Sequence, residues 1–167
     1  MSEFRVAILT ASDSGAAGER ADRSGKIIEE MVRAVGWTVT RTAITRDERA
    51  VIAEQLREWA DGGDVSLIVT TGGTGVGPRD VTPEATLDVV DRLVPGMAEQ
   101  MRAQTAERNP MAMVSRQVVG IRGRTLIINL PGSPRGVQEC LAVLMPVLPH
   151  TLEVLTQPRT DDHPTQA

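Results

Sequence analysis

The sequence predicts an α/β fold in which a mostly parallel β-sheet is covered on both faces by helices. Short apolar runs alternate along the chain with longer segments whose apolar residues recur at helical spacing. A stretch rich in Gly, Ser, Thr or Pro follows three of the apolar runs, at residues 10–15, 70–80 and 130–136. Because parallel strands end at one edge of a sheet, these stretches are expected to form one site.

The first half of the chain contains three expected strands and two expected helices. The strand-like segments are short and apolar, and each helical segment carries one apolar face and is followed by glycine. The expected strands are residues 4–10, 37–44 and 65–70, and the expected helices are residues 24–35 and 47–60.

The second half is expected to contain further helices and a β-hairpin. Thr82 suits the N-cap of a helix, Pro83 its first turn, and Glu84 the positive end of its dipole. The expected elements are a helix from Thr82 to about Leu93, a helix after Pro95, a hairpin within residues 115–130 that turns at Arg122–Arg124, and a C-terminal helical region broken near Pro146 and Pro149.

Composition limits the class of protein. A chain of 167 residues with 41% hydrophobic residues fits one domain, assigned to residues 1–157. The polar residues 158–167 are expected to form a disordered tail. A net charge of −4 and 2% aromatic residues argue against nucleic acid as a partner. No apolar run reaches the about 20 residues that cross a membrane, so no membrane association is expected.

Cysteine and histidine are scarce. The single cysteine, Cys140, excludes an internal disulfide, and the N-terminus lacks a secretory pattern, so a cytoplasmic location is expected. One cysteine and two histidines argue against a zinc site and against a Cys–His or Ser–His nucleophile. Because Lys26 is the only lysine, phosphate chemistry here would have to use arginine, main-chain N–H groups or a metal.

The glycine-rich stretch TTGGTGVGPRD at residues 70–80 differs from two well-known phosphate loops. It is not a Walker A loop, since no lysine follows its glycines, and Gly73, Gly75 and Gly77 are too evenly spaced for a dinucleotide fingerprint. Glycines nevertheless let a phosphate approach successive N–H groups, and Thr74 adds a hydroxyl. Turn geometry alone explains any one of the three stretches. Their common location is what predicts a site.

The sequence TTGGTGVGPRDVTPEAT resembles the signature of the MogA/MoaB family of molybdenum-cofactor biosynthesis proteins, which is related to the G domain of gephyrin. The resemblance runs from Arg5 to about Leu155 and includes PGMAEQMR, SRQVVGIR and INLPGSPRGVQECL. It implies a three-layer α/β/α fold with a mostly parallel sheet and a small β-hairpin. It also implies a homotrimer.

The resemblance further implies a molybdopterin adenylyltransferase. Such an enzyme transfers AMP from Mg-ATP to the terminal phosphate of molybdopterin and releases pyrophosphate, so ATP would be the co-substrate and Mg²⁺ the cofactor. A phosphomonoester, with a second pKa of about 6, is already largely ionised at neutral pH, so the attacking phosphate needs no histidine base. A hand-off to a molybdenum-inserting, MoeA-like partner is also implied. The alternative is a non-catalytic, MoaB-like molybdopterin-binding or scaffold protein, and the choice between molybdenum and tungsten stays open.

The site residues that the resemblance implies include two acids. Asp47 and Asp80 match positions linked to catalysis and metal handling. By sequence alone, the alternative for Asp47 is an ordinary N-cap, and the alternative for Asp80 is an exposed carboxylate at a helix N-terminus that is stabilised by the helix dipole or paired with Arg79. Arg79 is either a phosphate clamp or a structural partner of the loop. Arg116 matches at a strand start, where a solvated edge explains it equally, and Asp22 matches in a variable loop. The implied substrate-binding residues are Ser12, Asp13, Gly72, Gly73, Thr74, Gly75, Arg79, Ser115, Pro131, Gly132 and Ser133.

Overall fold

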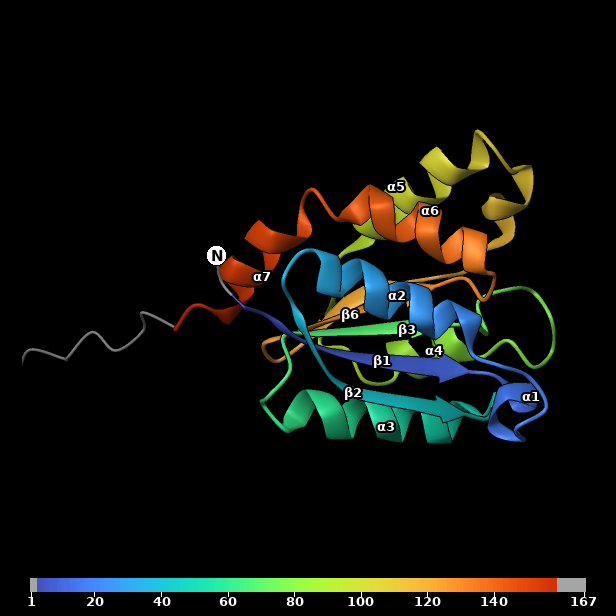
Figure 1. The fold of residues 1–167 in the computed structure, drawn as a ribbon, viewed down its shortest axis with the longest axis horizontal. Helices are drawn as coiled ribbons and strands as arrows, with labels where there is room; N and C mark the ends of the chain where they lie inside the picture. The colour runs from blue at the N-terminus through green and yellow to red at the C-terminus, as the bar shows by residue number, and fades with distance from the viewer. Residues whose placement is uncertain (1–2, 159–167) are drawn as a thin grey trace, which may run out of the picture.

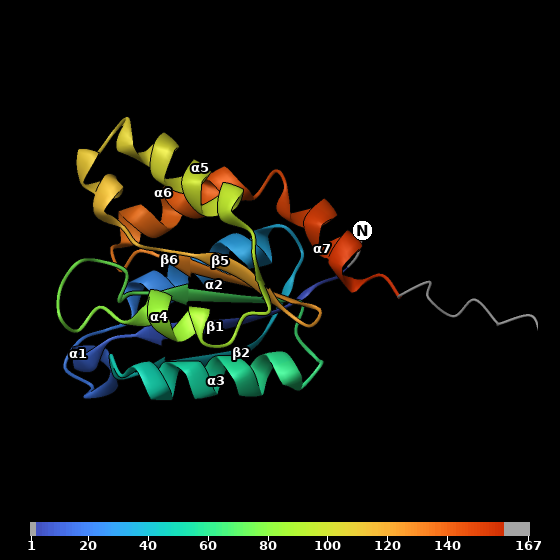
Figure 2. The ribbon, with the colours of Figure 1, turned by 180° about the vertical axis from the view of Figure 1, so that it is seen from behind.

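The computed structural model describes residues 3–158 and is built on one six-stranded sheet (Figures 1 and 2). The strand order is β2-β1-β3-β6-β5-β4. Strands β2, β1, β3 and β6 are parallel, and β5 is antiparallel to both β6 and β4, which confirms a mostly parallel sheet. The strands are β1 (Arg5–Ala11), β2 (Thr38–Thr45), β3 (Leu67–Thr71), β4 (Arg92–Leu93), β5 (Val119–Arg122) and β6 (Thr125–Leu130).

Helices cover both faces of the sheet, so the predicted three-layer architecture is confirmed. Helices α2, α5, α6 and α7 pack on one face, and α3 and α4 pack on the other. The helical elements are α1 (Asp13–Ala16), α2 (Arg23–Ala34), α3 (Arg49–Asp61), α4 (Thr82–Leu87), α5 (Pro95–Ala106), the 3₁₀ helix η1 (Pro110–Val114), α6 (Pro134–Leu144) and α7 (Leu148–Thr156).

The central strands are buried on both faces, which explains their unbroken apolar sequences. In β1, Val6 and Ile8 join the core beneath α2, α5, α6 and α7, whereas Ala7 and Leu9 join the core beneath α3 and α4. Strands β3 and β6 divide their side chains between the two cores in the same way. The sheet is therefore a rigid base for the loops at its ends.

The loops after β1, β3 and β6 meet at one end of the sheet, as predicted. The chain passes from β1 to β2 on one side and then places β3 on the other side of β1. This reversal is a topological switch point, where ligands bind in open α/β sheets. In Figure 1 the strands β1 and β3 end toward the right, beside α1 and the start of α2.

The prediction of one helix from Thr82 to about Leu93 is wrong. Helix α4 ends at Leu87, and β4 pairs with β5 instead. The main-chain N–H of Asp91 donates to the carbonyl of Ile121 (2.7 Å), which begins this pairing. Gly120 makes room for the side chain of Val90, because a Cβ on Gly120 would lie 2.7 Å from Cγ1 of Val90. The apolar spacing of this segment suits a helix, but its pairing with β5 decides its structure instead.

Both predicted N-caps differ in the structure. Val81 is the N-cap of α4, and Thr82 is instead the first helical residue, with a buried hydroxyl that has no hydrogen-bond partner among the described residues. Glu48 is the N-cap residue of α3 and makes no side-chain cap, so Asp47 is not the N-cap.

The remaining elements follow the sequence more closely. The hairpin of β5 and β6 is confirmed and turns at Gly123, which has a φ of +57°. Helices α1 and η1 were not predicted, and the predicted tail lies outside the described residues from position 159 onward. Over residues 3–158 no single helix has the length and apolar content of a membrane span. Taken together, α6 and α7 have that length and apolar content, but they are bent by 66° relative to each other.

Candidate functional site

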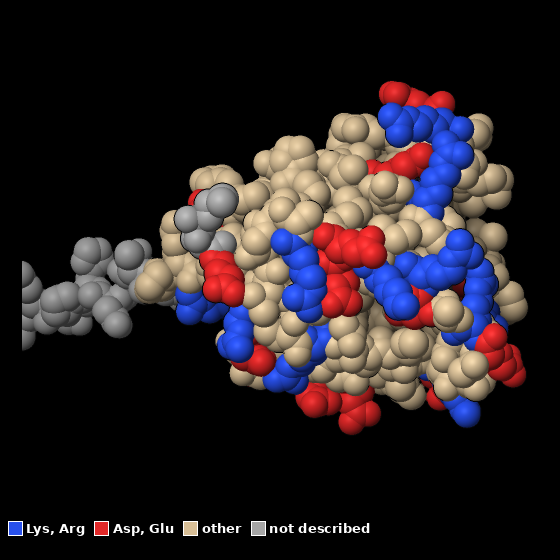
Figure 3. Space-filling view, in the orientation of Figure 1, with Lys and Arg blue, Asp and Glu red and all other residues tan. Residues whose placement is uncertain are grey.

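A cavity of about 360 Å³ opens at the carboxyl ends of β1 and β3. Its wall includes Ser12, the segment 20–24, Gly72 and the segment 132–134. Helices α2 and α6 both begin at this wall, and their N-terminal N–H groups favour an anionic ligand. Basic side chains gather over the start of α2 (Figure 3), and Arg20 belongs to the lining. The cavity thus suits a phosphorylated molecule.

Side-chain hydrogen bonds hold the cavity wall together. Asp22 caps α2 by accepting from the N–H of Gly25 (2.8 Å), and its other oxygen accepts from the hydroxyl of Thr10 in β1 (2.7 Å). Ser24 donates to the carbonyl of Gly132 (2.7 Å) and so links α2 to the loop after β6. These hydrogen bonds therefore tie the cavity wall to β1, to α2 and to the loop after β6.

Two glycines in the cavity lining bring main-chain segments close together. Gly72 has a φ of +93°, and a Cβ at this position would lie 2.3 Å from the carbonyl oxygen of Ala11. A Cβ on Gly132 would lie 3.3 Å from the Cα of Gly72. The loops after β1, β3 and β6 thus approach more closely than side chains allow, which explains glycine at these positions.

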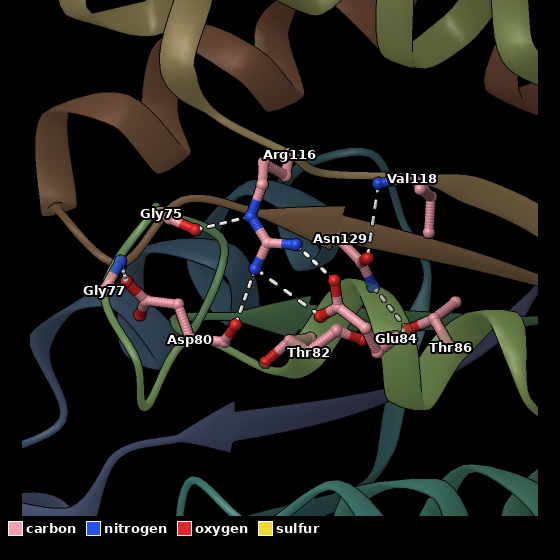
Figure 4. Close-up of polar contacts among 9 residues, drawn as sticks. All are labelled: Gly75, Gly77, Asp80, Thr82, Glu84, Thr86, Arg116, Val118 and Asn129. Carbon is pink, nitrogen blue, oxygen red and sulfur yellow. Dashed lines mark hydrogen bonds and ion pairs between the residues drawn. The ribbon is translucent and has the colours of Figure 1, made fainter.

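The glycine loop, residues 72–80, leaves several N–H groups unbonded. The N–H groups of Gly73, Thr74, Gly75 and Val76 donate to no group within residues 3–158. Asp80 closes the loop, because its Oδ2 accepts from the N–H of Gly77 (2.9 Å; Figure 4). Successive free N–H groups are the donors that an anion nest requires.

Asp13, Asp47 and Arg79 connect the loops after β1 and β2 to the glycine loop. The N–H of Asp13 donates to Asp47 Oδ2, and the N–H of Asp47 donates to Asp13 Oδ1, both at 3.0 Å. Arg79 donates to both carboxylate oxygens of Asp13 (2.9 and 3.0 Å). The predicted alternative that Asp80 pairs with Arg79 is therefore wrong.

The electrostatics of these acids differ. Hydrogen bonds from Arg79 hold the pKa of Asp13 below its ordinary value. Burial raises the pKa of Asp47, and the charges of Asp13 and Asp80 raise it further, against the lowering effect of the Asp13 N–H. Ionised Asp47 is therefore destabilised unless a cation is bound nearby.

Asp47 and Asp80 fit a magnesium ion that is shared with a phosphate ligand. No cluster of three or more His, Cys, Asp or Glu side chains that could hold a metal occurs within residues 3–158. One oxygen of each acid, Oδ1, accepts no hydrogen bond from the described residues. Mg²⁺ is typically bound through one or two protein carboxylates plus substrate phosphates, which matches this donor set.

We expect Asp47→Asn to stabilise the metal-free protein near neutral pH. A carboxyl whose folded-state pKa is raised stabilises the fold only while protonated, and it loses that contribution as the pH rises through the folded-state pKa. Asparagine removes the charge and keeps an acceptor for the N–H of Asp13. The melting temperature should therefore rise near neutral pH, and the gain should shrink toward pH 4. A lower melting temperature at neutral pH would contradict this electrostatic assignment.

The structure divides the predicted site residues into three groups. Ser12, Gly72, Gly132 and Ser133 line the large cavity. Ser115, Pro131 and Ser133 line a second cavity of about 130 Å³. The remaining predicted residues belong to the glycine loop or to the acidic connections, namely Asp13, Asp47, Gly73, Thr74, Gly75, Arg79 and Asp80.

Sequence reasoning missed part of the cavity wall. Arg20, Arg23 and Ser24 line the cavity, and only their nearness to a predicted helix start signals this role. Arg116 is not on a solvated edge: it is half-buried and bonded to the glycine loop and to Glu84 (Figure 4).

Fold and site together define an α/β protein with a cavity at a switch point of its sheet, walled in part by two helix N-termini. The family model of a probable molybdopterin binding domain matches residues 7–150, and the chain belongs to this family. It is 39% identical to the molybdopterin adenylyltransferase of Helicobacter pylori strain J99, covering 93% of this chain and 89% of that protein. It is 41% identical to that of Escherichia coli K12, covering 84% and 73%.

Solved structures agree with this assignment. The crystal structure of the molybdopterin biosynthesis enzyme MoaB from Thermus thermophilus superposes with a TM-score of 0.87 at 50% identity, covering 93% of this chain and 98% of that one. The structure of the tungsten cofactor synthesizing protein MoaB from Pyrococcus furiosus superposes with a TM-score of 0.84 at 30% identity, covering 94% and 99%.

Proposed function

We propose that this protein is a molybdopterin adenylyltransferase that uses ATP and Mg²⁺. The observation that carries the proposal is that two acids, Asp47 and Asp80, lie beside a glycine loop with unbonded N–H groups. Carboxylates and free N–H groups are what a reaction between two anionic phosphates requires. The relatives named molybdopterin adenylyltransferase support the choice of substrates.

In the proposed reaction a phosphate oxygen of molybdopterin attacks the α-phosphorus of ATP. The new P–O bond joins AMP to the pterin phosphate. The bond between the α-phosphorus and the oxygen that bridges it to the β-phosphorus breaks, which releases pyrophosphate. The unbonded N–H groups of the glycine loop would hold phosphate oxygens, and Asp47 and Asp80 would hold Mg²⁺. The metal supplies charge neutralisation at the transferring phosphate. Arg79, bonded to Asp13 on two oxygens, would order the loop instead of clamping phosphate.

The proposal assigns the two substrates to the two neighbouring cavities. They adjoin at Ser133, which lines both. The proposal places the reacting phosphates near this shared wall and near the glycine loop. A cytoplasmic location, a homotrimer and delivery of the product to a metal-inserting partner remain predictions of the same proposal.

The deciding experiment combines purified protein, molybdopterin and Mg-ATP. We expect adenylylated pterin and pyrophosphate in equal amounts. Excess EDTA should abolish both products, because the triphosphate needs its metal, whereas binding of molybdopterin should persist on main-chain donors. Binding without product would favour the non-catalytic alternative, and full product formation in EDTA would refute the assigned metal role.

A further inference from the structure

Arg116 forms hydrogen bonds with the glycine loop near its start and at its end (Figure 4). Its Nε donates to the carbonyl of Gly75 (2.7 Å), and its Nη2 donates to the carbonyl of Asp80 (2.6 Å). Its own main-chain N–H donates to the carbonyl of Thr74 (2.7 Å). One residue outside the loop therefore binds three of its carbonyl groups.

Glu84 holds the guanidinium in this position. It accepts from both Nη atoms of Arg116, and this pairing lowers the pKa of the Glu84 carboxyl. Both side chains are about one-third exposed, at 36% and 34%. Because Glu84 lies in the first turn of α4, the guanidinium is fixed between the glycine loop and a helix.

These contacts orient the N–H groups of the loop. In a trans peptide the C=O and the following N–H point in opposite directions. When the carbonyls of Thr74 and Gly75 face Arg116, the N–H groups of Gly75 and Val76 must face away from it. These two N–H groups are among those with no partner within residues 3–158. Arg116 thus occupies the acceptors and leaves the donors of the loop available.

The same contacts fix Asp80. Its carbonyl is bound by Arg116, its N–H donates to the carbonyl of Gly77 (3.0 Å), and its Oδ2 accepts from the N–H of Gly77. Its Oδ1 accepts no hydrogen bond from the described residues. The direction of this acid therefore depends on where Arg116 holds the main chain.

We infer that Arg116, held by Glu84, is a positioning residue that sets the glycine loop for adenylyl transfer. It acts through main-chain carbonyls, and this inference rests on the proposed function. A displacement of about 1 Å at a reacting group can cost about a hundredfold in rate. Loss of Arg116 should therefore slow the chemical step much more than it weakens molybdopterin binding.

The test compares Arg116→Gln and Arg116→Lys with Arg49→Gln. Arg49 also makes a two-bond ion pair, with Asp88, but it contacts neither the loop nor the cavities. We expect both Arg116 variants to lose about a hundredfold in single-turnover rate with a small change in molybdopterin affinity. Compared with Arg116→Gln, the lysine variant should regain thermal stability through an ion pair with Glu84. It should not regain the single-turnover rate, because lysine cannot reach the carbonyls of both Gly75 and Asp80. The Arg49 variant should turn over like the wild type.

A second measurement separates failure of this inference from failure of the proposed function. Amide hydrogen exchange at Gly77 reports whether the loop is held, and it needs no substrate. We expect faster exchange in both Arg116 variants and unchanged exchange in Arg49→Gln. A wild-type rate in folded Arg116→Lys would overturn the inference and leave the function intact. If the wild type itself proves inactive, unchanged exchange at Gly77 in Arg116→Lys still overturns the inference. If Arg116→Gln fails to fold, the exchange and turnover of Arg116→Lys alone test the inference.

Discussion

Asp80→Asn is expected to lower the single-turnover rate of adenylyl transfer by about a hundredfold, a loss on the order of 3 kcal/mol in transition-state stabilisation. Asparagine keeps an oxygen that can accept from the N–H of Gly77, so the loop should keep its shape. What disappears is the negative charge that the proposal assigns to Mg²⁺. Molybdopterin binding should persist.

Asp88→Asn is the matched control for this variant. Asp88 is an exposed acid at the end of α4 that pairs with Arg49, away from the glycine loop. It should lose only a surface ion pair that contributes little to stability, and retain full turnover. Melting curves for both variants establish that they fold. An Asp80→Asn protein that turns over at the wild-type rate would remove Asp80 from the catalytic assignment.

Gly72→Ala is expected to destabilise the protein by roughly 2–5 kcal/mol. Two costs add at this buried position. A φ of +93° is unfavourable for alanine, and the new Cβ would lie 2.3 Å from the carbonyl oxygen of Ala11. Because both partners are main chain at the ends of β1 and β3, relief requires moving a strand end.

Gly36→Ala separates these two costs. Gly36 has a φ of +85°, and a Cβ there would meet nothing within 4 Å. This control should therefore lose only the conformational cost of about 1–2 kcal/mol. Chemical denaturation of both variants and the wild type measures the difference. Equal losses in the two variants would show that the contact with Ala11 does not constrain the loop.

The sheet and its loops were predictable from the sequence because their signals are local. Buried parallel strands read as apolar runs, and helices carry their periodicity within a few turns. The meeting of the loops after β1, β3 and β6 then follows from parallel connectivity alone. For this reason the stretches that contain Ser12, Gly72, Gly132 and Ser133 could be expected at one end of the sheet.

The polar contacts of the site were not predictable in the same way. Arg79 pairs with Asp13, 66 positions away, and Arg116 binds Gly75, 41 positions away. Neither partner is marked by spacing or propensity, and the neighbouring Asp80 is the obvious but incorrect partner for Arg79. The strand β4 was missed for a related reason, since two residues give no periodicity and only pairing with β5 defines them.

The unbonded main-chain N–H groups of residues 73–76 have a consequence for how mutations can affect the proposed site. A point mutation can replace a side chain, but it cannot delete a peptide N–H unless it introduces proline. Phosphate recognition that uses the main chain is therefore insulated from sequence drift, provided that the glycines persist. The side chains at the rim, such as Arg20 and Arg23, have no such protection. Under the proposed function, substitutions at the rim would change which phosphorylated molecule is selected, while the main-chain donors that hold its phosphate would stay in place.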